Sequence, residues 1–198
     1  MPQSRCAGAL YHPAMSENAS VCVLPAQRVS LRWMRTHPAH IWALGFGVGL
    51  SPRAPGTLGT LWAWLVFVVL QPWLNDWAWA GLIGLAWLLG WWASAVAAKS
   101  LCVLDPCAVV CDEIVAFWLV LWLLMPASWW EQALAFALFR FFDAVKPGPV
   151  GWADRLFHHV DPQSDRLAWP KAALGIMLDD VLAAACTLLL LALWRFAT

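Results

Sequence analysis

The feature that most limits the fold is a long stretch without a basic residue, from Arg53 to Lys99. It holds two apolar runs, residues 57–74 and 77–98, which meet at the turn Gln71-Pro-Trp-Leu-Asn-Asp76. An α-helix rises about 1.5 Å per residue, so each run is long enough to cross roughly 30 Å of hydrocarbon. We therefore expect two membrane-spanning helices in this part of the chain.

Three further apolar runs follow, at residues 114–130, 132–142 and 174–194. The chain is 62% hydrophobic and only 12% charged, whereas a soluble domain is about a quarter charged. The surplus of apolar side chains has to face lipid. The run at 132–142 is short for a full crossing, so it either tilts or pairs with the preceding run as a hairpin. The pattern predicts an all-α, polytopic membrane helical bundle with about four to five transmembrane or membrane-embedded helices.

Residues 1–40 differ from the rest, because they are polar and lack an apolar segment after a basic start. They therefore do not have the pattern of a signal peptide. We expect a flexible N-terminal tail at residues 1–40 and one membrane domain at residues 41–198. The formal net charge is zero, so bulk charge indicates no nucleic-acid partner, and nothing in the sequence implies a protein partner.

The basic residues predict the orientation in the membrane. Most of them fall at residues 28–53, at Lys99 and at residues 140–171, while the loops around Asn75 and Ser128 have none. Loops rich in Lys and Arg stay in the cytoplasm, so we expect a cytoplasmic N-terminus and a cytoplasmic site. Four tryptophans then fall at the outer interface, as an aromatic belt would: Trp73, Trp77, Trp129 and Trp130.

Acidic pairs stand directly beside apolar runs at two places. Asp112 and Glu113 precede the run that begins at Ile114, and Asp179 and Asp180 precede a nearly apolar stretch. Carboxylates at the mouth of a membrane helix are costly unless a cation, a metal or water accompanies them. Oxygen ligands with few histidines suit Mg²⁺. We therefore expect these four acidic residues to be metal ligands.

A mixed cluster of charge lies at Arg140, Asp143 and Lys146, spaced to share one helix face. A helix end that anchors its two cations at the interface is the alternative interpretation, but it leaves Asp143 unexplained. Arg and Lys suit a phosphate. Together with Mg²⁺ they suit phosphoryl chemistry, whose transition state gathers charge on the equatorial oxygens.

The segment Ser51-Pro-Arg-Ala-Pro-Gly-Thr-Leu-Gly-Thr60 does not fit a helix interior, because it contains two prolines and two glycines. We expect a shaped loop that ends at a helix N-terminus, with Thr57 or Thr60 as the N-cap. The free N–H groups and the helix dipole of such a terminus favour an anion. A tight turn between two helices is the alternative.

These motifs together resemble one family. The segments are Gly49-Leu-Ser-Pro-Arg-Ala-Pro-Gly-Thr-Leu-Gly-Thr60, Val110-Cys-Asp-Glu113, Phe139-Arg-Phe-Phe-Asp-Ala-Val-Lys-Pro-Gly-Pro149, Asp154-Arg155 and Gly175-Ile-Met-Leu-Asp-Asp180. In this order they are similar to the phosphatidylglycerophosphatase A family, from about residue 41 to the C-terminus. The resemblance implies a Mg²⁺-dependent lipid phosphatase of the bacterial inner membrane, which hydrolyses phosphatidylglycerophosphate to phosphatidylglycerol and phosphate.

The resemblance also implies the site residues, and a phospholipid in the bilayer as the binding partner. The expected catalytic residues are Asp112, Glu113, Arg140, Asp143, Lys146, Asp154 and Arg155. The expected substrate-binding residues are Ser51, Arg53, Gly56, Thr57, Gly59 and Thr60. Arg140, Lys146 and Arg155 are expected to hold the phosphomonoester.

Two other classes were weighed against this interpretation. A CDP-alcohol phosphotransferase is also membrane-bound and Mg²⁺-dependent, but its spaced Asp-Gly, Ala-Arg and paired Asp signature is missing here. A small transporter or ion-binding membrane protein places its charges near the bilayer midplane, often in paired repeats. In this chain the charges gather at one predicted face and no repeat is visible, so an enzyme is favoured.

Overall fold

The computed structural model describes residues 29–146 and 167–197, and within these ranges the regular structure is helical, with no strand. The elements are α1 (Leu31–Met34), α2 (Pro38–Ala43), the 3₁₀ segment η1 (Gly45–Leu50), α3 (Pro55–Leu70), α4 (Asp76–Leu101), α5 (Cys111–Leu124), α6 (Trp129–Val145) and α8 (Ala168–Ala197). The predicted all-α class is confirmed for the described residues.

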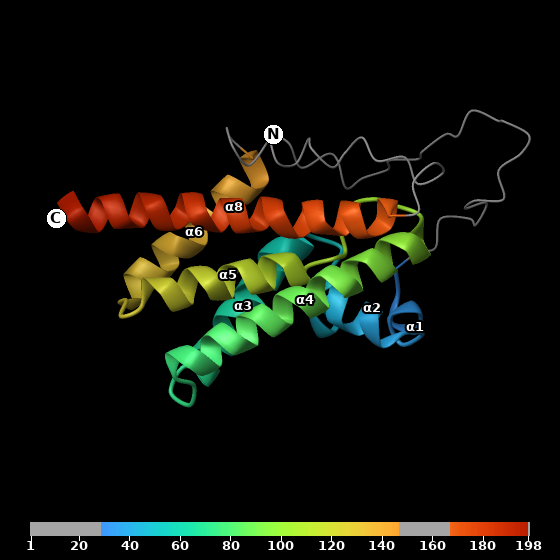
Figure 1. Ribbon diagram of the computed structural model, residues 1–198, viewed down its shortest axis with the longest axis horizontal. Coiled ribbons are helices and arrows are strands. Elements are labelled where there is room, and N and C mark those ends of the chain that lie inside the picture. The colour runs from blue at the N-terminus through green and yellow to red at the C-terminus, as the bar shows by residue number, and fades with distance from the viewer. Residues whose placement is uncertain (1–28, 147–166, 198) are drawn as a thin grey trace, which may run out of the picture.

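The long helices give the molecule two distinct ends (Figure 1). The C-terminus, the turn from α3 to α4 and the turn from α5 to α6 lie at one end. The end of α4, the start of α8 and the short helices α1 and α2 lie at the other. The five expected helical runs therefore appear as α3, α4, α5, α6 and α8, in the predicted order.

Two of the described helices, α4 and α8, are long and apolar enough to cross a membrane, and α3 is a shorter apolar helix. Large apolar side chains point outward from these helices instead of into the bundle. Examples are Leu65, Val69, Leu85, Leu88, Leu189 and Leu193. The structure thus contains two candidate spans, and the finer expectation of four to five remains a prediction.

Helix α5 is the central element of the bundle. It packs against α3, α4, α6 and α8, and most of its side chains are buried, including Phe117, Val120 and Leu121. A helix that is apolar all round requires such surroundings. Side-chain contacts fix its position, because Trp118 donates from Nε1 to the carbonyl of Ala63 at 2.9 Å and the ring of Phe117 packs against that of Phe139 in a tilted arrangement.

The ends of α3 and α5 differ from the sequence expectation. Helix α3 begins at Pro55 and its N-cap is Ala54, in the left-handed region, so neither Thr57 nor Thr60 is the N-cap. Proline is favoured at the first helical position, because its missing N–H would be unpaired there in any case. Helix α5 ends at Leu124, before Pro126, and not near residue 130.

The turn after α5 sets the start of α6. Ser128 caps α6, with a reciprocal hydrogen bond from its own backbone to Glu131. This capping box starts the helix at Trp129, three residues before the apolar run at 132–142. Helix α6 is therefore longer than the predicted run.

Part of the expected N-terminal tail is folded. Trp33 and Met34 in α1 are buried, and the ring of His40 stacks on Trp33 at a centroid distance of 3.8 Å. His40 Nε2 also lies 3.1 Å from the hydroxyl of Ser100 on α4. Residues 29–40 thus belong to the helical domain, and residues 1–28 lie outside the described residues.

Candidate active site

The site begins at the first turn of α5, which carries Asp112 and Glu113. Acidic side chains are favoured at this end of a helix, where the free N–H groups and the dipole attract negative charge. The backbone N–H of Val110 donates to the carbonyl of Ala43 at 2.9 Å, which ties this turn to α2. The sequence therefore places two carboxylates at the buried start of the central helix.

Asp180 on α8 completes a group of three carboxylates. One oxygen from each of Asp112, Glu113 and Asp180 lies within 4.8 Å of the others. Asp112 and Asp180 are only 7% and 4% exposed. Each of the three side chains also has a buried oxygen without a hydrogen-bond partner: Asp112 Oδ1, Glu113 Oε2 and Asp180 Oδ2.

Three carboxylates at this separation, two of them buried and that of Glu113 half-buried, repel one another, and their buried unpaired oxygens carry a desolvation cost. A divalent cation offsets both effects, since it supplies positive charge and accepts oxygen ligands. The donor set therefore fits a hard metal ion, and the residues that could hold it come from α5 and α8.

Arg140 of α6 lies beside this group. Its Nη1 is 3.7 Å from Glu113 Oε1 and 2.5 Å from Asp143 Oδ2. Nevertheless Nη1 has no hydrogen bond of good geometry and is buried. The guanidinium therefore stands between a carboxylate of the acidic group and a second carboxylate on its own helix, with donor capacity left for an anion.

Gly56, in the first turn of α3, makes room for this arrangement. A Cβ atom built at Gly56 would lie 2.2 Å from Glu113 Oε1 and 3.1 Å from Arg140 Nη2. A larger residue would require the side chains of Glu113 and Arg140 to shift. The N-terminus of α3 thus approaches the same point as Glu113 and Arg140, as the anion-binding interpretation of the loop requires.

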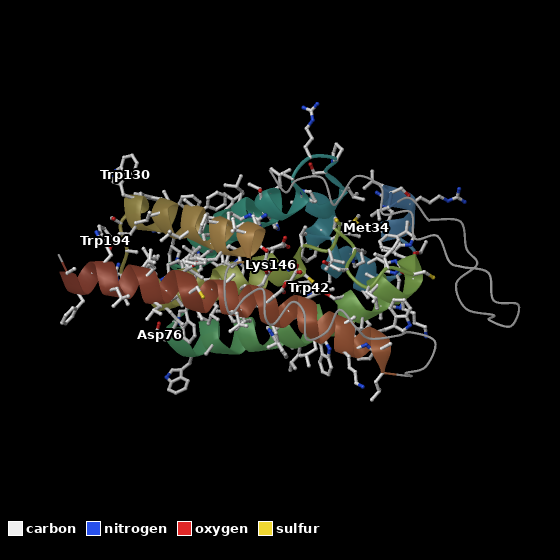
Figure 2. The ribbon with its side chains drawn as sticks, turned by 90° about the horizontal axis from the view of Figure 1, so that it is seen from above. Met34, Trp42, Asp76, Trp130, Lys146 and Trp194 are labelled. Atoms are coloured by element: carbon white, nitrogen blue, oxygen red, sulfur yellow. The ribbon has the colours of Figure 1, made fainter. Side chains whose placement is uncertain are left out.

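The second cation, Lys146, pairs with a different acid. Its Nζ forms an ion pair with Asp179 Oδ2, so Asp179 faces Lys146 while its neighbour Asp180 joins the three-carboxylate group. Lys146 lies toward the middle of the molecule, whereas Asp76, Trp130 and Trp194 lie toward one end of it, at the left of Figure 2. The structure therefore divides the four expected metal ligands into a group of three and an ion-paired fourth.

The remaining residues of the 51–60 loop have local partners. The Ser51 hydroxyl donates to the carbonyl of Arg53 at 2.9 Å, and the side chain of Arg53 is exposed. Thr60 is buried and donates to the carbonyl of Gly56 within its own helix. A Cβ at Gly59 would lie 3.0 Å from Val110 Cβ, so this glycine permits close packing of α3 on α5.

Thr57 is half-buried in the first turn of α3, one residue beyond Gly56. Of the six expected substrate-binding residues, Gly56 is the one that the described contacts bring against Glu113 and Arg140. The other expected pair, Asp154 and Arg155, lies outside the described residues.

Two glycines that we did not expect near the site hold α5 in place. A Cβ at Gly49 would lie 2.0 Å from the carbonyl oxygen of Ala108, and one at Gly45 would lie 2.7 Å from Ile114 Cδ1. Both glycines therefore allow η1 to press against the loop and the first turn that present Asp112 and Glu113. Their alternation along the chain, with Gly47 between them, was the available signal.

Comparison with known proteins agrees with these observations. Residues 41–195 match the family described as Phosphatidylglycerophosphatase A. The chain belongs to this family. The resemblance inferred from the motifs is thereby confirmed, and so is the enzyme class, a phosphatase.

The matches to individual relatives extend over most of the length of each relative. The chain is 34% identical over 152 residues to phosphatidylglycerophosphatase A of Escherichia coli (strain K12), which is 77% of this chain and 80% of the relative. It is 35% identical over 160 residues to phosphatidylglycerophosphatase A of Haemophilus influenzae (81% and 88%). A putative phosphatidylinositol-3-phosphatase of Bacteroides thetaiotaomicron is 38% identical over 159 residues (77% and 90%). No solved structure matches the chain.

Proposed function

We propose that this member of the phosphatidylglycerophosphatase A family is a Mg²⁺-dependent enzyme that hydrolyses phosphatidylglycerophosphate to phosphatidylglycerol and phosphate. The observation that carries the proposal is the group of three carboxylates with buried unpaired oxygens, which stands directly beside Arg140. A cation site next to an arginine is what a phosphomonoester requires, because its head group carries up to about two negative charges near neutral pH.

In this proposal Asp112, Glu113 and Asp180 hold the metal. Mg²⁺ prefers oxygen ligands and keeps several waters, and when bound it supplies charge neutralisation for the phosphoryl group and lowers the pKa of its bound water. Asp179 was expected as a fourth ligand, and its ion pair with Lys146 supports a different task, the positioning of that lysine.

Arg140 and Lys146 are proposed to bind the phosphoryl oxygens. Arg140 presents a planar set of donors that matches a phosphate. Its ion pair with Asp143 orients the guanidinium beside the group of three carboxylates. The first turn of α3 adds backbone N–H groups beside Gly56. Arg155, which was expected to assist, and Asp154, which was expected to be catalytic, stay part of the proposal.

The substrate head group is the point at which the relatives differ in name. Two relatives are named for phosphatidylglycerophosphate and one for a phosphatidylinositol 3-phosphate. Phosphate release by the purified full chain should be measured on both lipids, and on phosphatidic acid, each in the same mixed micelles. We expect the highest kcat/KM on phosphatidylglycerophosphate, loss of turnover with EDTA and recovery with Mg²⁺.

The same assay separates the proposal from its alternatives. A mock preparation from cells that do not express the chain gives the contaminant background, and Asp112→Ala should fall to that level. A protein that releases no phosphate from any of the three lipids, with or without Mg²⁺, is not a lipid phosphatase, and the transporter or ion-binding alternative then gains support. A preference for phosphatidylinositol 3-phosphate would keep the chemistry and overturn the substrate.

The proposed location is the bacterial inner membrane, with several crossings and with the N-terminus and the site in the cytoplasm. The distribution of Lys and Arg supports this orientation. Single cysteines at Asn75 and Val103, in a cysteine-free background, should be labelled in intact cells by a membrane-impermeant reagent. We expect labelling at position 75 only, and labelling at position 103 alone would invert the topology.

A further inference from the structure

The segment before the phosphate-binding loop has a surface that the proposed catalytic reaction does not use. Residues 29–53 contain three arginines and no acidic residue. In α1, Arg32 and Arg35 are exposed, and Leu31 beside them is 58% exposed. The same short helix buries Trp33 and Met34. This packing fixes the helix that carries the exposed basic and apolar side chains.

The turn that follows α2 exposes a second large apolar side chain. Gly45, Phe46 and Gly47 all have positive φ, at 53°, 59° and 109°. Phe46 is 61% exposed and touches Trp42 edge-on at a ring distance of 5.5 Å. A phenylalanine in the left-handed region is strained, because its Cβ lies too close to the following carbonyl oxygen. A strained backbone that holds an aromatic ring outward points to a contact with something outside the chain.

The position of this segment along the bundle indicates what that contact is. His37 of the α2 N-cap lies 5.9 Å from the ring of Trp92, and His40 contacts Ser100. Both partners are in the second half of α4, at the end of the molecule where α1 and α2 lie (Figure 1). A hydrocarbon core of roughly 30 Å takes up about 20 helical residues. Counted from Trp77, it ends near residue 97 of α4, between the two contacts, so α1 and α2 lie at the boundary between the hydrocarbon and the lipid head groups.

The charge at this depth comes from the arginines. Burial lowers the pKa of His40 below its ordinary value, and the nearby His37 lowers it further, while a hydrogen bond to the carbonyl of Trp33 acts in the opposite direction. Basic side chains beside exposed apolar ones, with no acidic residue among them, fit an anionic lipid surface better than water or a neutral surface.

We propose that α1 and the turn at Phe46 form a docking surface for anionic lipid head groups, in which Arg32 and Arg35 contact the phosphates and Leu31 and Phe46 enter the layer beneath. The turn packs through Gly45 against Ile114 of α5, next to Asp112 and Glu113. The surface therefore gathers anionic lipid beside the candidate site. It does not depend on the proposed reaction, because it requires only the lipid charge.

A binding measurement without turnover tests this surface. The purified full chain in neutral detergent is mixed with equal amounts of phosphatidylserine and phosphatidylcholine with matched acyl chains, and the retained lipids are counted by native mass spectrometry. We expect the parent to retain phosphatidylserine preferentially. Arg32→Gln with Arg35→Gln should reduce this preference by up to about fivefold per arginine, because each cation near the head groups adds about that much affinity.

A matched control removes the same charge elsewhere. Lys99→Gln with Lys171→Gln deletes two exposed cations at the same end of the bundle but outside α1, and it should reduce the preference clearly less than the arginine variant does. An equal loss in both double variants would overturn the proposal, since net charge alone would then explain the selectivity. Retention of the full preference by the arginine variant would overturn it as well.

Phe46→Gly tests the apolar part of the surface. Glycine adopts positive φ without strain, so this variant should melt within a few degrees of the parent, while retaining fewer phosphatidylserine molecules. A variant that unfolds instead, with lipid selectivity of the folded fraction unchanged, would show that Phe46 packs for stability and does not bind lipid. Phosphatase activity plays no part in any of these results, so a failure here is distinct from a failure of the proposed function.

Discussion

Two arginines, one near the start of α5 and one near its end, each face a glutamate, and they differ in how fully their donors are used. Arg195 donates from Nε to Glu131 Oε1 at 2.9 Å, and from its other nitrogens to the carbonyls of Leu124 and Pro126. Arg140 lies between Glu113 and Asp143, and its buried Nη1 lacks a hydrogen bond of good geometry.

The difference separates a structural contact from a binding site. Arg195 satisfies the carbonyls left open at the end of α5 and so closes the turn into α6. Around Arg140, by contrast, the oxygens of Asp112, Glu113 and Asp180 remain unpaired and buried. Native proteins rarely leave such groups without partners, so the carboxylates beside Arg140 are the candidate ligand site.

The largest expected difference between the two ends comes from their acidic residues. Asp112→Asn removes one negative charge from the group of three carboxylates with little change in shape, and turnover should fall to the background level. Glu131→Gln at the other end should keep turnover within about twofold of the parent, since Glu131 contacts only Ser128 and Arg195 among the described residues. Phosphate release at saturating Mg²⁺ measures both.

Bound metal gives a second readout for this pair of variants. We expect Asp112→Asn to bind Mn²⁺, used as a spectroscopic substitute, more weakly than Glu131→Gln does. Comparable turnover in the two variants would contradict the assignment of the carboxylate group and remove the contrast between the two ends.

The next effect is steric. Gly56→Ala places a methyl group 2.2 Å from the present position of Glu113 Oε1, so Glu113 or Arg140 has to move. A displacement of about 1 Å in a catalytic group costs on the order of a hundredfold in rate. Gly81→Ala in α4 is the matched control, because a Cβ there meets nothing within 4 Å.

The control should be neutral, or stabilising by about 0.5–1 kcal/mol, because alanine is the better helix former. Measured kcat/KM and melting temperature of the two variants separate a local clash from a general loss of folding. If Gly56→Ala is as active as Gly81→Ala, the first turn of α3 does not border the site.

A smaller effect is expected from Arg140 itself. Arg140→Ala deletes a charged hydrogen-bond donor to the substrate and should cost about 1.5–3 kcal/mol, or roughly ten- to a hundredfold in kcat/KM. Arg140→Lys should recover only part of this loss, because lysine lacks the planar fork. Kinetics on phosphatidylglycerophosphate check both, and full activity of Arg140→Ala would leave Arg140 as a helix-end anchor.

Much of this contrast was predictable from sequence. The order of the five long helices follows from the apolar runs, and the acidic pairs stand out because carboxylates beside such runs are costly. The sequence does not reveal how adjacent acids are divided. Asp179 and Asp180 are neighbours on α8. The packing of the helices pairs Asp179 with Lys146 and places Asp180 beside Asp112 and Glu113.

Two other features depended on contacts between distant segments. The N-cap of α3 is set by a left-handed Ala54 before Pro55, whereas hydroxyl residues are the usual caps. The fold of residues 29–40 depends on the stacking of His40 on Trp33 and its contact with Ser100. A polar composition alone does not show such burial, so the predicted tail extended too far.

The smallest expected effect concerns Arg195, and it tests the structural half of the comparison. Arg195→Gln loses the ion pair with Glu131 and at least one carbonyl contact. The Arg195 side chain is 36% exposed, so solvent weakens the pair, and we expect a loss of about 1 kcal/mol of stability. For a chain of this size that lowers the melting temperature in detergent by roughly 2–4 °C.

The kinetic part of this prediction is what distinguishes Arg195 from Arg140. Turnover of Arg195→Gln below its melting temperature should stay within about twofold of the parent, because α5 presents Asp112 and Glu113 from its opposite end. Arg195→Lys keeps the charge facing Glu131 but lacks the spread of donors that reaches both carbonyls. Its melting temperature should therefore fall between those of the parent and of Arg195→Gln. A tenfold loss of turnover in Arg195→Gln without a change in melting temperature would mean that the hydrogen-bonded end also serves the chemistry.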